Sequence, residues 1–141
     1  MLRGVADTNI LVSAAISAVG ICGQLLTAAE EGRWELVVSP EILAELEYVL
    51  RRDKKLQRRF SAEDVAIYLR RLRRIAQVLP DAPQPWPEVT RDPKDDYLVA
   101  LAKSVGVDAL VSGDPHLTEL VDLVPPVMRP ADFLAMLREG R

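Results

Sequence analysis

The segment 2–12 has the sequence Leu2-Arg3-Gly4-Val5-Ala6-Asp7-Thr8-Asn9-Ile10-Leu11-Val12, in which a short apolar run gives way to three polar residues and then resumes. This pattern is typical of a buried parallel strand whose carboxyl end opens onto a loop and a helix. Ligands of open α/β sheets bind at that end of the strands. Asp7 is predicted to lie there, and a carboxylate so close to a core costs free energy unless a partner group or a metal ion compensates its charge.

The composition predicts one globular domain in a reducing compartment. The chain has 141 residues, of which 49% are hydrophobic and 28% are charged, and these values fit a soluble protein with its own core. Its one cysteine, Cys22, excludes an internal disulfide and a CxxC metal site. The sequence shows no signal peptide and no apolar run of membrane-spanning length. We therefore expect a cytoplasmic protein that makes no contact with a membrane.

The charge is distributed unevenly, although the net value is only -3. Residues 51–74 hold ten basic side chains and three acidic ones, whereas the rest of the chain holds eight basic and eighteen acidic ones. A basic segment on an acidic body indicates a polyanion that binds near an acidic, metal-loaded centre. A solvated, salt-bridged helical hairpin would give the same charge pattern.

Strands and helices are predicted to alternate along the chain. Apolar runs predict strands before Asp7 and over residues 35–38, 77–79, 108–112 and 121–127. Helical periodicity and capping residues predict helices over residues 10–16, 21–31, 40–50, 62–75, 93–105 and 131–138. This alternation predicts an α/β fold with a central parallel sheet of four to five strands and helices on both faces. We expect a single domain over residues 1–141, with a basic helical segment at about 51–76.

Four acids occupy related places in this predicted fold. Asp7 and Asp114 follow strands, while Glu45 and Asp96 lie near the starts of helices. In a right-handed doubly wound sheet all four can converge at the carboxyl edge. Clustered carboxylates repel one another unless cations bind, and oxygen ligands without a cysteine or a histidine pair suit Mg²⁺ or Mn²⁺. Such a site suits hydrolysis of a phosphodiester bond.

The sequence resembles the PIN-domain family, in particular the VapC-related toxin components of toxin–antitoxin systems. The resemblance lies in four blocks in the same order, at residues 7–13, 39–46, 91–96 and 111–114. It implies a PIN-like fold and a Mg²⁺- or Mn²⁺-dependent endoribonuclease that cuts RNA. It also implies a homodimer or higher homo-oligomer and a cognate antitoxin protein as partner.

The resemblance assigns a role to each of the four acids. It makes Asp7, Glu45, Asp96 and Asp114 the catalytic set, with three of them as metal ligands and Glu45 acting through water. Capping and helix-dipole effects explain the neighbouring Asp92 and Asp95. Three further residues are expected to support the carboxylates through hydrogen bonds: Thr8, Asn9 and Ser112.

The loop after Asp114 departs from the family pattern, because His116 stands where many relatives place another acid. That change puts the strength of a second metal site in doubt. His116 is a metal ligand, a phosphate contact or a neutral loop residue. The residues expected to contact RNA are Arg51, Arg52, Lys54, Lys55 and His116.

Two other functions are compatible with parts of the sequence. A non-catalytic PIN-like module that binds RNA or a protein would keep the fold without using the acids for chemistry. A phosphotransferase would use Asp7 as a nucleophile, but it would usually carry a second aspartate two residues later, where this chain has Asn9. A serine hydrolase is disfavoured because no serine has a histidine partner in the predicted site.

Overall fold

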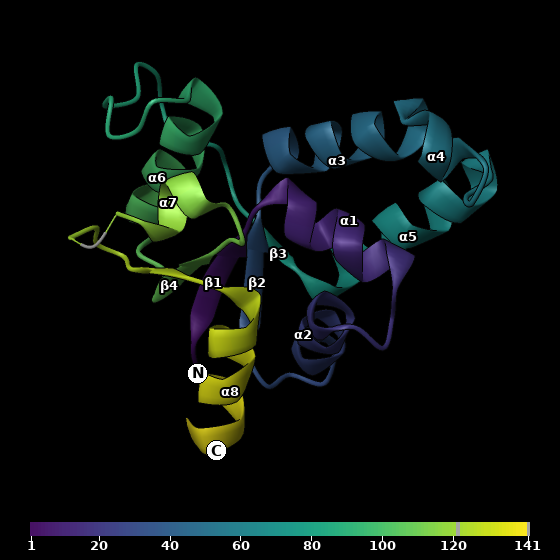
Figure 1. The fold of residues 1–141 in the computed structure, drawn as a ribbon, viewed down its shortest axis with the longest axis horizontal. Coiled ribbons are helices and arrows are strands. Elements are labelled where there is room, and N and C mark those ends of the chain that lie inside the picture. The colour runs from purple at the N-terminus through teal and green to yellow at the C-terminus, as the bar shows by residue number, and fades with distance from the viewer. Residues whose placement is uncertain (121, 141) are drawn as a thin grey trace.

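A five-stranded parallel sheet forms the centre of the protein, for which a computed structural model describes residues 1–120 and 122–140. The strands lie in the order β3-β2-β1-β4-β5, so the chain begins in the middle of the sheet and builds outward on both sides (Figure 1). This arrangement confirms the predicted α/β fold. The strands are β1 (Arg3–Ala6), β2 (Glu35–Val38), β3 (Gln77–Val78), β4 (Ala109–Val111) and β5 (Val127–Met128).

The middle strand, β1, is buried from both sides. Val5 pairs with Val37 of β2 and with Leu110 of β4, and all three side chains are buried. The continuous apolar run of β1 follows from this double burial, since both faces of a parallel sheet are covered by helices. The pairing with β4 extends one residue beyond the strand, where the Asp7 amide donates to the Val111 carbonyl at 3.1 Å. Asp7 is thus fixed at the carboxyl end of the central strand.

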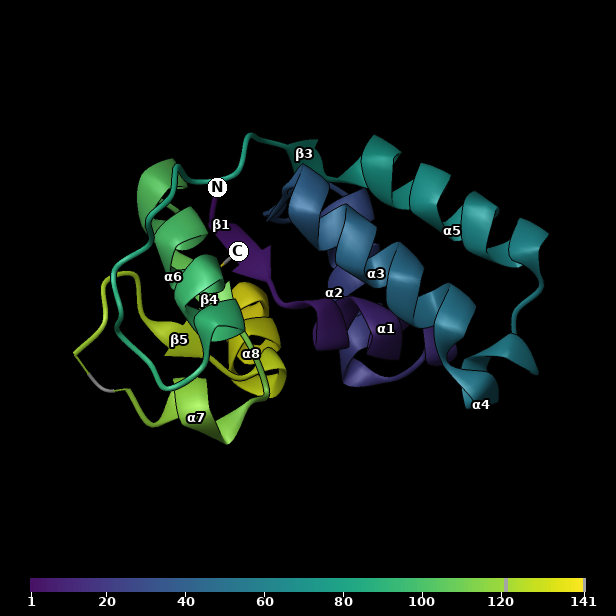
Figure 2. The same ribbon diagram turned by 90° about the horizontal axis from the view of Figure 1, so that it is seen from above.

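Helices cover both faces of the sheet. In Figure 2, α6 lies on one side of the strands and α2 and α8 lie on the other, while α3 and α5 form an outer pair beyond α1. The helices are α1 (Thr8–Ile16), α2 (Ile21–Glu30), α3 (Pro40–Arg52), α4 (Lys54–Gln57), α5 (Ala62–Ile75), α6 (Pro93–Val105), α7 (Pro115–Thr118) and α8 (Pro130–Gly140). Within the described ranges no single helix is long and apolar enough to cross a membrane, and α1 and α2 meet that requirement only as a pair bent by 96°.

Capping residues set the starts of the helices as the sequence predicts. The Ser39 hydroxyl accepts from the Ile42 amide at the start of α3. Ser61 and Asp64 form a reciprocal capping box at the start of α5. Asp92 caps α6, which ends at Gly106 in the left-handed conformation with φ of 74°. The sequence predicts these helix ends because each capping residue satisfies backbone groups that a helix leaves free there.

The structure differs from the predicted elements mainly in the connecting segments. Helix α3 continues to Arg52, beyond its predicted end, whereas the short helix α4 agrees with the expected basic helical segment. The edge strand expected over residues 121–127 is instead β5, which begins at Val127, and Val121 lies outside the described residues. Pro125 and Pro126 explain the later start, because proline has no amide to donate to a neighbouring strand.

The contact between Trp34 and Phe133 joins α8 to the sheet, and its loss should destabilise the fold. The two rings meet edge to face with centroids 4.9 Å apart, and Phe133 is fully buried. We expect Phe133→Ala to lower the free energy of unfolding by about 3–5 kcal/mol, and Phe133→Leu by less because it leaves a smaller cavity. Urea unfolding measures both values, and a loss below about 1 kcal/mol for the alanine variant would contradict this packing.

Candidate functional site

Asp7 is the central acid of the candidate site. Its side chain is buried, with only 6% of the residue exposed. One carboxylate oxygen accepts from the Ile10 amide at 3.0 Å, and the other accepts from the Ser112 hydroxyl. Burial raises the pKa of the Asp7 carboxyl, and the charge of Asp114 adds to that rise, although the hydrogen bonds from Ser112 and Ile10 oppose it. The hydrogen bonds to Asp7 favour its charged form and so offset part of the free-energy cost of burial.

Asp114 lies beside Asp7 because β1 and β4 are neighbours in the sheet. It follows β4 and caps the short helix α7, where its Oδ1 accepts from the His116 amide at 2.9 Å. The Ser112 hydroxyl links the two acids, since it donates to Asp7 and accepts from the Asp114 amide at 3.1 Å. Two strands thus deliver two carboxylates to one edge, as the sequence predicts for the ends of parallel strands.

Asp95 is the third acid at this edge. It lies in the first turn of α6 and only 7% of the residue is exposed. Burial raises the pKa of the Asp95 carboxyl to about 6, and the charges of Asp114, Asp92 and Asp7 contribute to the rise while His116 opposes it. Asp95 also lines one cavity with His116, whose amide donates to Asp114, so Asp95 and Asp114 lie at the same edge. We call Asp7, Asp95 and Asp114 the acid edge.

The Asp96 carboxylate, which the sequence resemblance assigns to the metal site, is hydrogen-bonded to the loop before α6. Its Oδ1 accepts from the amides of Val89 at 2.9 Å and Thr90 at 2.7 Å. Burial alone would raise the pKa of the Asp96 carboxyl, but these two hydrogen bonds outweigh burial and lower it. The carboxylate of Asp96 therefore holds the loop before α6, and its neighbour Asp95 faces the acid edge. Consecutive helical residues point about 100° apart, so only one of the two can do so.

Glu45 lies near the start of α6. It is half-buried on α3 and lines a cavity of about 430 Å³ together with Tyr48, Trp86 and Lys94. The acids whose charges raise the pKa of Asp95 are Asp114, Asp92 and Asp7. The action of Glu45 at the acid edge therefore stays a prediction from the sequence.

The three residues predicted to support the carboxylates do not all contact them. Ser112 bonds to Asp7 as expected, and it is fully buried. Thr8 is buried and Asn9 is exposed, but within residues 1–120 and 122–140 neither side chain makes a hydrogen bond to an acid. The contribution of Asn9 comes from its backbone, whose hydrogen bond lowers the pKa of Asp7.

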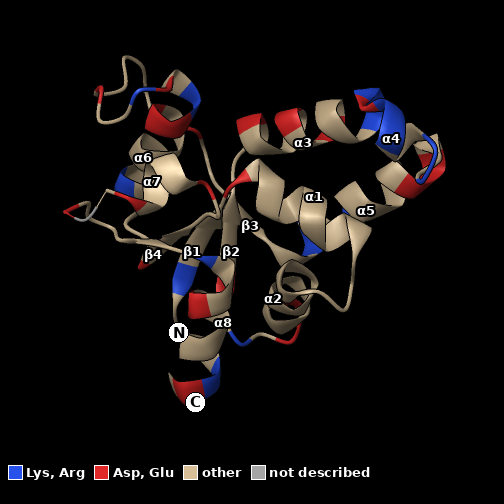
Figure 3. Ribbon diagram, viewed as in Figure 1, with Lys and Arg blue, Asp and Glu red and all other residues tan. Residues whose placement is uncertain are grey.

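The basic residues expected to contact RNA gather at the far end of α3 from its start. Figure 3 shows blue segments around α4, whereas red segments lie at the starts of α3 and α6. The length of α3 separates the two regions by roughly 20 Å. Arg51 is paired with Glu47 at 2.9 Å, while Lys54 and Lys55 are exposed. His116 lies at the acid edge instead, on a cavity of about 750 Å³ that it lines with Asp95 and others.

The donor chemistry of the acid edge fits a hard divalent cation. Its three acids supply only oxygen, and their mutual repulsion is the feature that a bound cation relieves. In the part of the chain that the structure describes, no three acidic, histidine or cysteine side chains converge closely enough to form a complete ligand set. Mg²⁺ commonly takes only one or two carboxylates and keeps several waters, so this more open arrangement suits magnesium rather than zinc.

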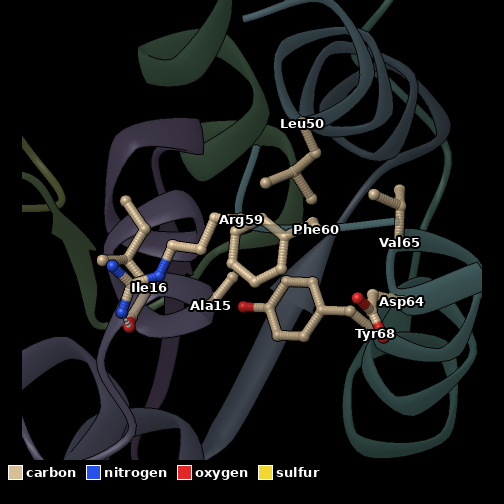
Figure 4. Close-up of a pocket in the computed structure, with 8 residues that line it drawn as sticks. All are labelled: Ala15, Ile16, Leu50, Arg59, Phe60, Asp64, Val65 and Tyr68. Carbon is tan, nitrogen blue, oxygen red and sulfur yellow. Dashed lines mark hydrogen bonds between the residues drawn. The ribbon is translucent and has the colours of Figure 1, made fainter. Parts of the chain in front are cut away.

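A cavity of about 410 Å³ lies between α1, α3 and α5, away from the acid edge (Figure 4). Apolar and polar groups line it in equal measure, and the Tyr68 hydroxyl beside it donates to the Leu11 carbonyl at 2.7 Å. The one acid in its lining, Asp64, belongs to the capping box of α5. The carboxylate chemistry of this protein is therefore located elsewhere.

The charge of Asp95 should make the metal-free protein less stable at neutral pH. Because its pKa is raised from 3.8 to about 6, the folded state holds the proton more tightly, and stability falls as the pH rises through that interval. We expect Asp95→Asn in EDTA to raise the free energy of unfolding by about 1–2 kcal/mol at pH 7.5 and by little at pH 4. Urea unfolding at both pH values measures the difference.

The exposed Glu31 provides a control for that experiment. Glu31→Gln removes one negative charge at the end of α2, just before the start of β2 and so at the opposite edge of the sheet, and should change the stability little at pH 7.5. An Asp95→Asn protein that is less stable than the wild type at pH 7.5 would mean that Asp95 does not face the other acids.

Comparisons with known proteins agree with this fold. A family model described as PIN domain matches residues 3–116. The structure is similar to that of PAE2754 from Pyrobaculum aerophilum, with a TM-score of 0.64 and 18% identity, covering 98% of this chain and 90% of that one. It is also similar to VapBC2 from Rickettsia felis, crystallised with a DNA fragment from their promoter, with a TM-score of 0.63 and 14% identity, covering 91% of this chain and 98% of that one.

No curated protein matches the sequence. At the identities of the two solved structures, the likeness concerns the fold. The family model, however, spans most of the 141 residues and includes all three residues of the acid edge. The chain therefore belongs to the PIN-domain family.

Proposed function

We propose that this protein is a Mg²⁺- or Mn²⁺-dependent endoribonuclease, and that it acts as the toxin of a toxin–antitoxin pair in the cytoplasm. The observation that carries the nuclease proposal is the acid edge, where three carboxylates repel one another at the carboxyl ends of β1 and β4 and at the start of α6. Clustered carboxylates of this kind hold divalent cations in enzymes that cut phosphodiester bonds. Family membership supports the same chemistry.

The proposal assigns a task to each residue of the site. Asp7 and Asp114 hold the metal, and Asp95 replaces Asp96 as the third acid because its carboxylate is not used by the loop. A divalent cation bound there supplies a water of lowered pKa and neutralises charge on the phosphate. Ser112 orients Asp7 and keeps it charged through its hydrogen bond. Glu45 acts at longer range, through water.

The proposed partners rest on the sequence resemblance and on the likeness to VapBC2. RNA is the substrate, and an antitoxin protein is the inhibitor. The basic residues around α4 bind the RNA backbone beyond the cleavage site, because clustered positive charge attracts phosphates without regard to sequence. His116 contacts a phosphate at the acid edge itself. The protein forms a homodimer or a higher homo-oligomer.

Substitution of the adjacent Asp95 and Asp96 shows which of the two acids takes part in cleavage and which holds the loop. Asp95→Asn should lower Mg²⁺-dependent cleavage of single-stranded RNA at least ~100-fold, because it removes a charge from the metal environment. Asp96→Asn should keep most of the cleavage but lose about 1–3 kcal/mol of stability, because it weakens two hydrogen bonds to a charged group. Gel assays below the melting temperature measure the first, and urea unfolding measures the second. The opposite pattern would restore Asp96 as the third acid.

Metal binding should stabilise the protein in a pH-dependent way. A tenfold excess of Mn²⁺ over its dissociation constant should raise the unfolding free energy by about 1.4 kcal/mol and the melting temperature by a few degrees. The shift should be larger at pH 7.5 than at pH 5, because protons compete with the cation for Asp95. Differential scanning calorimetry measures it, with Asp7→Asn as the variant that loses the shift.

An absent shift would favour the second candidate function, a PIN-like module that binds RNA or protein without catalysis. That function has one observation in its favour, since no complete set of three ligands is assembled within residues 1–120 and 122–140. The calorimetric result in the absence of RNA therefore distinguishes the two candidates.

A further inference from the structure

The loop before α6 carries a tryptophan, Trp86, that packs against the edge of the core. Trp86 is half-buried, and its indole nitrogen donates to the Ala82 carbonyl at 3.0 Å. Its ring also packs against Tyr97, with centroids 5.1 Å apart and planes inclined by 47°. The Tyr97 hydroxyl is in turn held by Ser39 and Asp81. Trp86 is therefore held in one orientation at the surface and is not a loose loop residue.

Trp86 faces a cavity that is lined mainly by apolar and aromatic groups. We call this cavity of about 430 Å³ the aromatic pocket, and its aromatic side chains are Tyr48, Trp86 and Tyr97. Tyr48 comes from α3 and is 63% exposed, although the Arg52 guanidinium lies 5.5 Å from the centre of its ring. An exposed aromatic ring beside a fixed tryptophan leaves two rings available to a flat ligand.

The charges around the aromatic pocket favour a nucleobase over a phosphate inside it. Glu41 and Glu45 line the cavity, so a phosphate group would meet negative charge there. The same carboxylates can accept hydrogen bonds from the amino groups of a base. Positive charge stands at two sides, with Lys94 in the lining and Arg52 over Tyr48. A base inside and a phosphate outside would satisfy both signs of charge.

The aromatic pocket also lies next to the acid edge. Pro93 and Lys94 line it, and Asp95 follows them directly in the first turn of α6. Pro93 lines the cavity of Asp95 and His116 as well. A strand that places one base in the pocket would therefore bring a neighbouring phosphate to the carboxylates.

From these observations we propose that the aromatic pocket binds one base of a single-stranded RNA, stacked against Tyr48 and Trp86, and so positions the adjacent phosphate at the acid edge. This inference rests on the proposed ribonuclease function and names its substrate class as unpaired RNA. Aromatic stacking tolerates any base, because every base has a flat face. Bases within a duplex are already stacked on their neighbours and cannot enter such a pocket.

Tryptophan fluorescence tests the pocket directly, because the protein has two tryptophans and the other, Trp34, is only 3% exposed. The Asp95→Asn protein is titrated in EDTA with a 12-nucleotide single-stranded RNA and with the matching duplex. We expect the single strand to quench the emission and the duplex to leave it unchanged. Binding of the single strand, detected by anisotropy of a labelled RNA, without any quenching would overturn the proposal.

Because Tyr48 is exposed, its substitution should leave the fold intact, and RNA binding by Tyr48 variants gives a second test. Tyr48→Ala should weaken the affinity for single-stranded RNA by about 5- to 100-fold, as expected for loss of one stacking platform. Tyr48→Phe should bind the RNA nearly as tightly as the parent protein, which keeps Tyr48. Ile67→Ala, on the exposed face of α5, is the matched control and should change nothing. Equal affinity of the Tyr48→Ala and parent proteins would contradict the proposal. A change in oligomeric mass with unchanged RNA affinity would assign the pocket to a contact between copies of the chain.

Cleavage assays separate a failure of this inference from a failure of the proposed function. If wild-type protein cuts RNA with Mg²⁺ and Tyr48→Ala cuts it equally well at subsaturating RNA, the pocket is not the binding site for a base but the nuclease stands. The opposite outcome is also possible: single-stranded RNA quenches the Trp86 fluorescence, Tyr48→Ala abolishes the quenching, and no cleavage occurs with Mg²⁺ or Mn²⁺. In that case the pocket binds a base, and the proposed nuclease function is wrong.

Discussion

The protein buries negative charge at the carboxyl edge of its sheet, and its strand order and hydrogen bonds accommodate that charge. Asp7 and Asp95 are almost completely covered, and Asp114 stands close enough to raise the pKa of both. The fold tolerates this because parallel strands end together and because the Ser112 hydroxyl and the Ile10 amide stabilise the charge of Asp7. The order of the strands, with β1 and β4 side by side, is what brings the acids to one edge.

Other acids near this edge have a structural task, and they fix the loop between β3 and α6. At one end of the loop, Asp81 accepts from the Glu41 amide at 3.2 Å and from the Tyr97 hydroxyl. At the other end, Asp96 accepts from two loop amides. The loop has no regular structure between these points, yet both of its ends are tied to helices that start beside the acid edge. This double attachment adds to the contacts of Trp86 with Ala82 and Tyr97.

The sequence predicts the sheet and the helix starts well, because these depend on local patterns. The apolar run before Asp7 and the capping residue Ser39 each determine an element within a few residues. The division of tasks between Asp95 and Asp96 was not predictable in this way. Both are acids in the first turn of one helix, and the hydrogen bonds from the Val89 and Thr90 amides to Asp96 distinguish them. The position of Glu45 also depends on how α3 packs against distant residues, which no local pattern records.

The start of α6 has a consequence for how the site tolerates change. Asp92 and Pro93 determine the residue at which the helix begins, and so they set its rotational phase against the sheet. A shift of that beginning by one residue would turn the first turn by about 100°, so that either Asp96 or Lys94 would take the direction that Asp95 now has. An exposed cap that touches no reacting group thus selects which side chain meets the other carboxylates. Insertions and deletions just before α6 are accordingly far less tolerable than the irregular shape of the loop suggests.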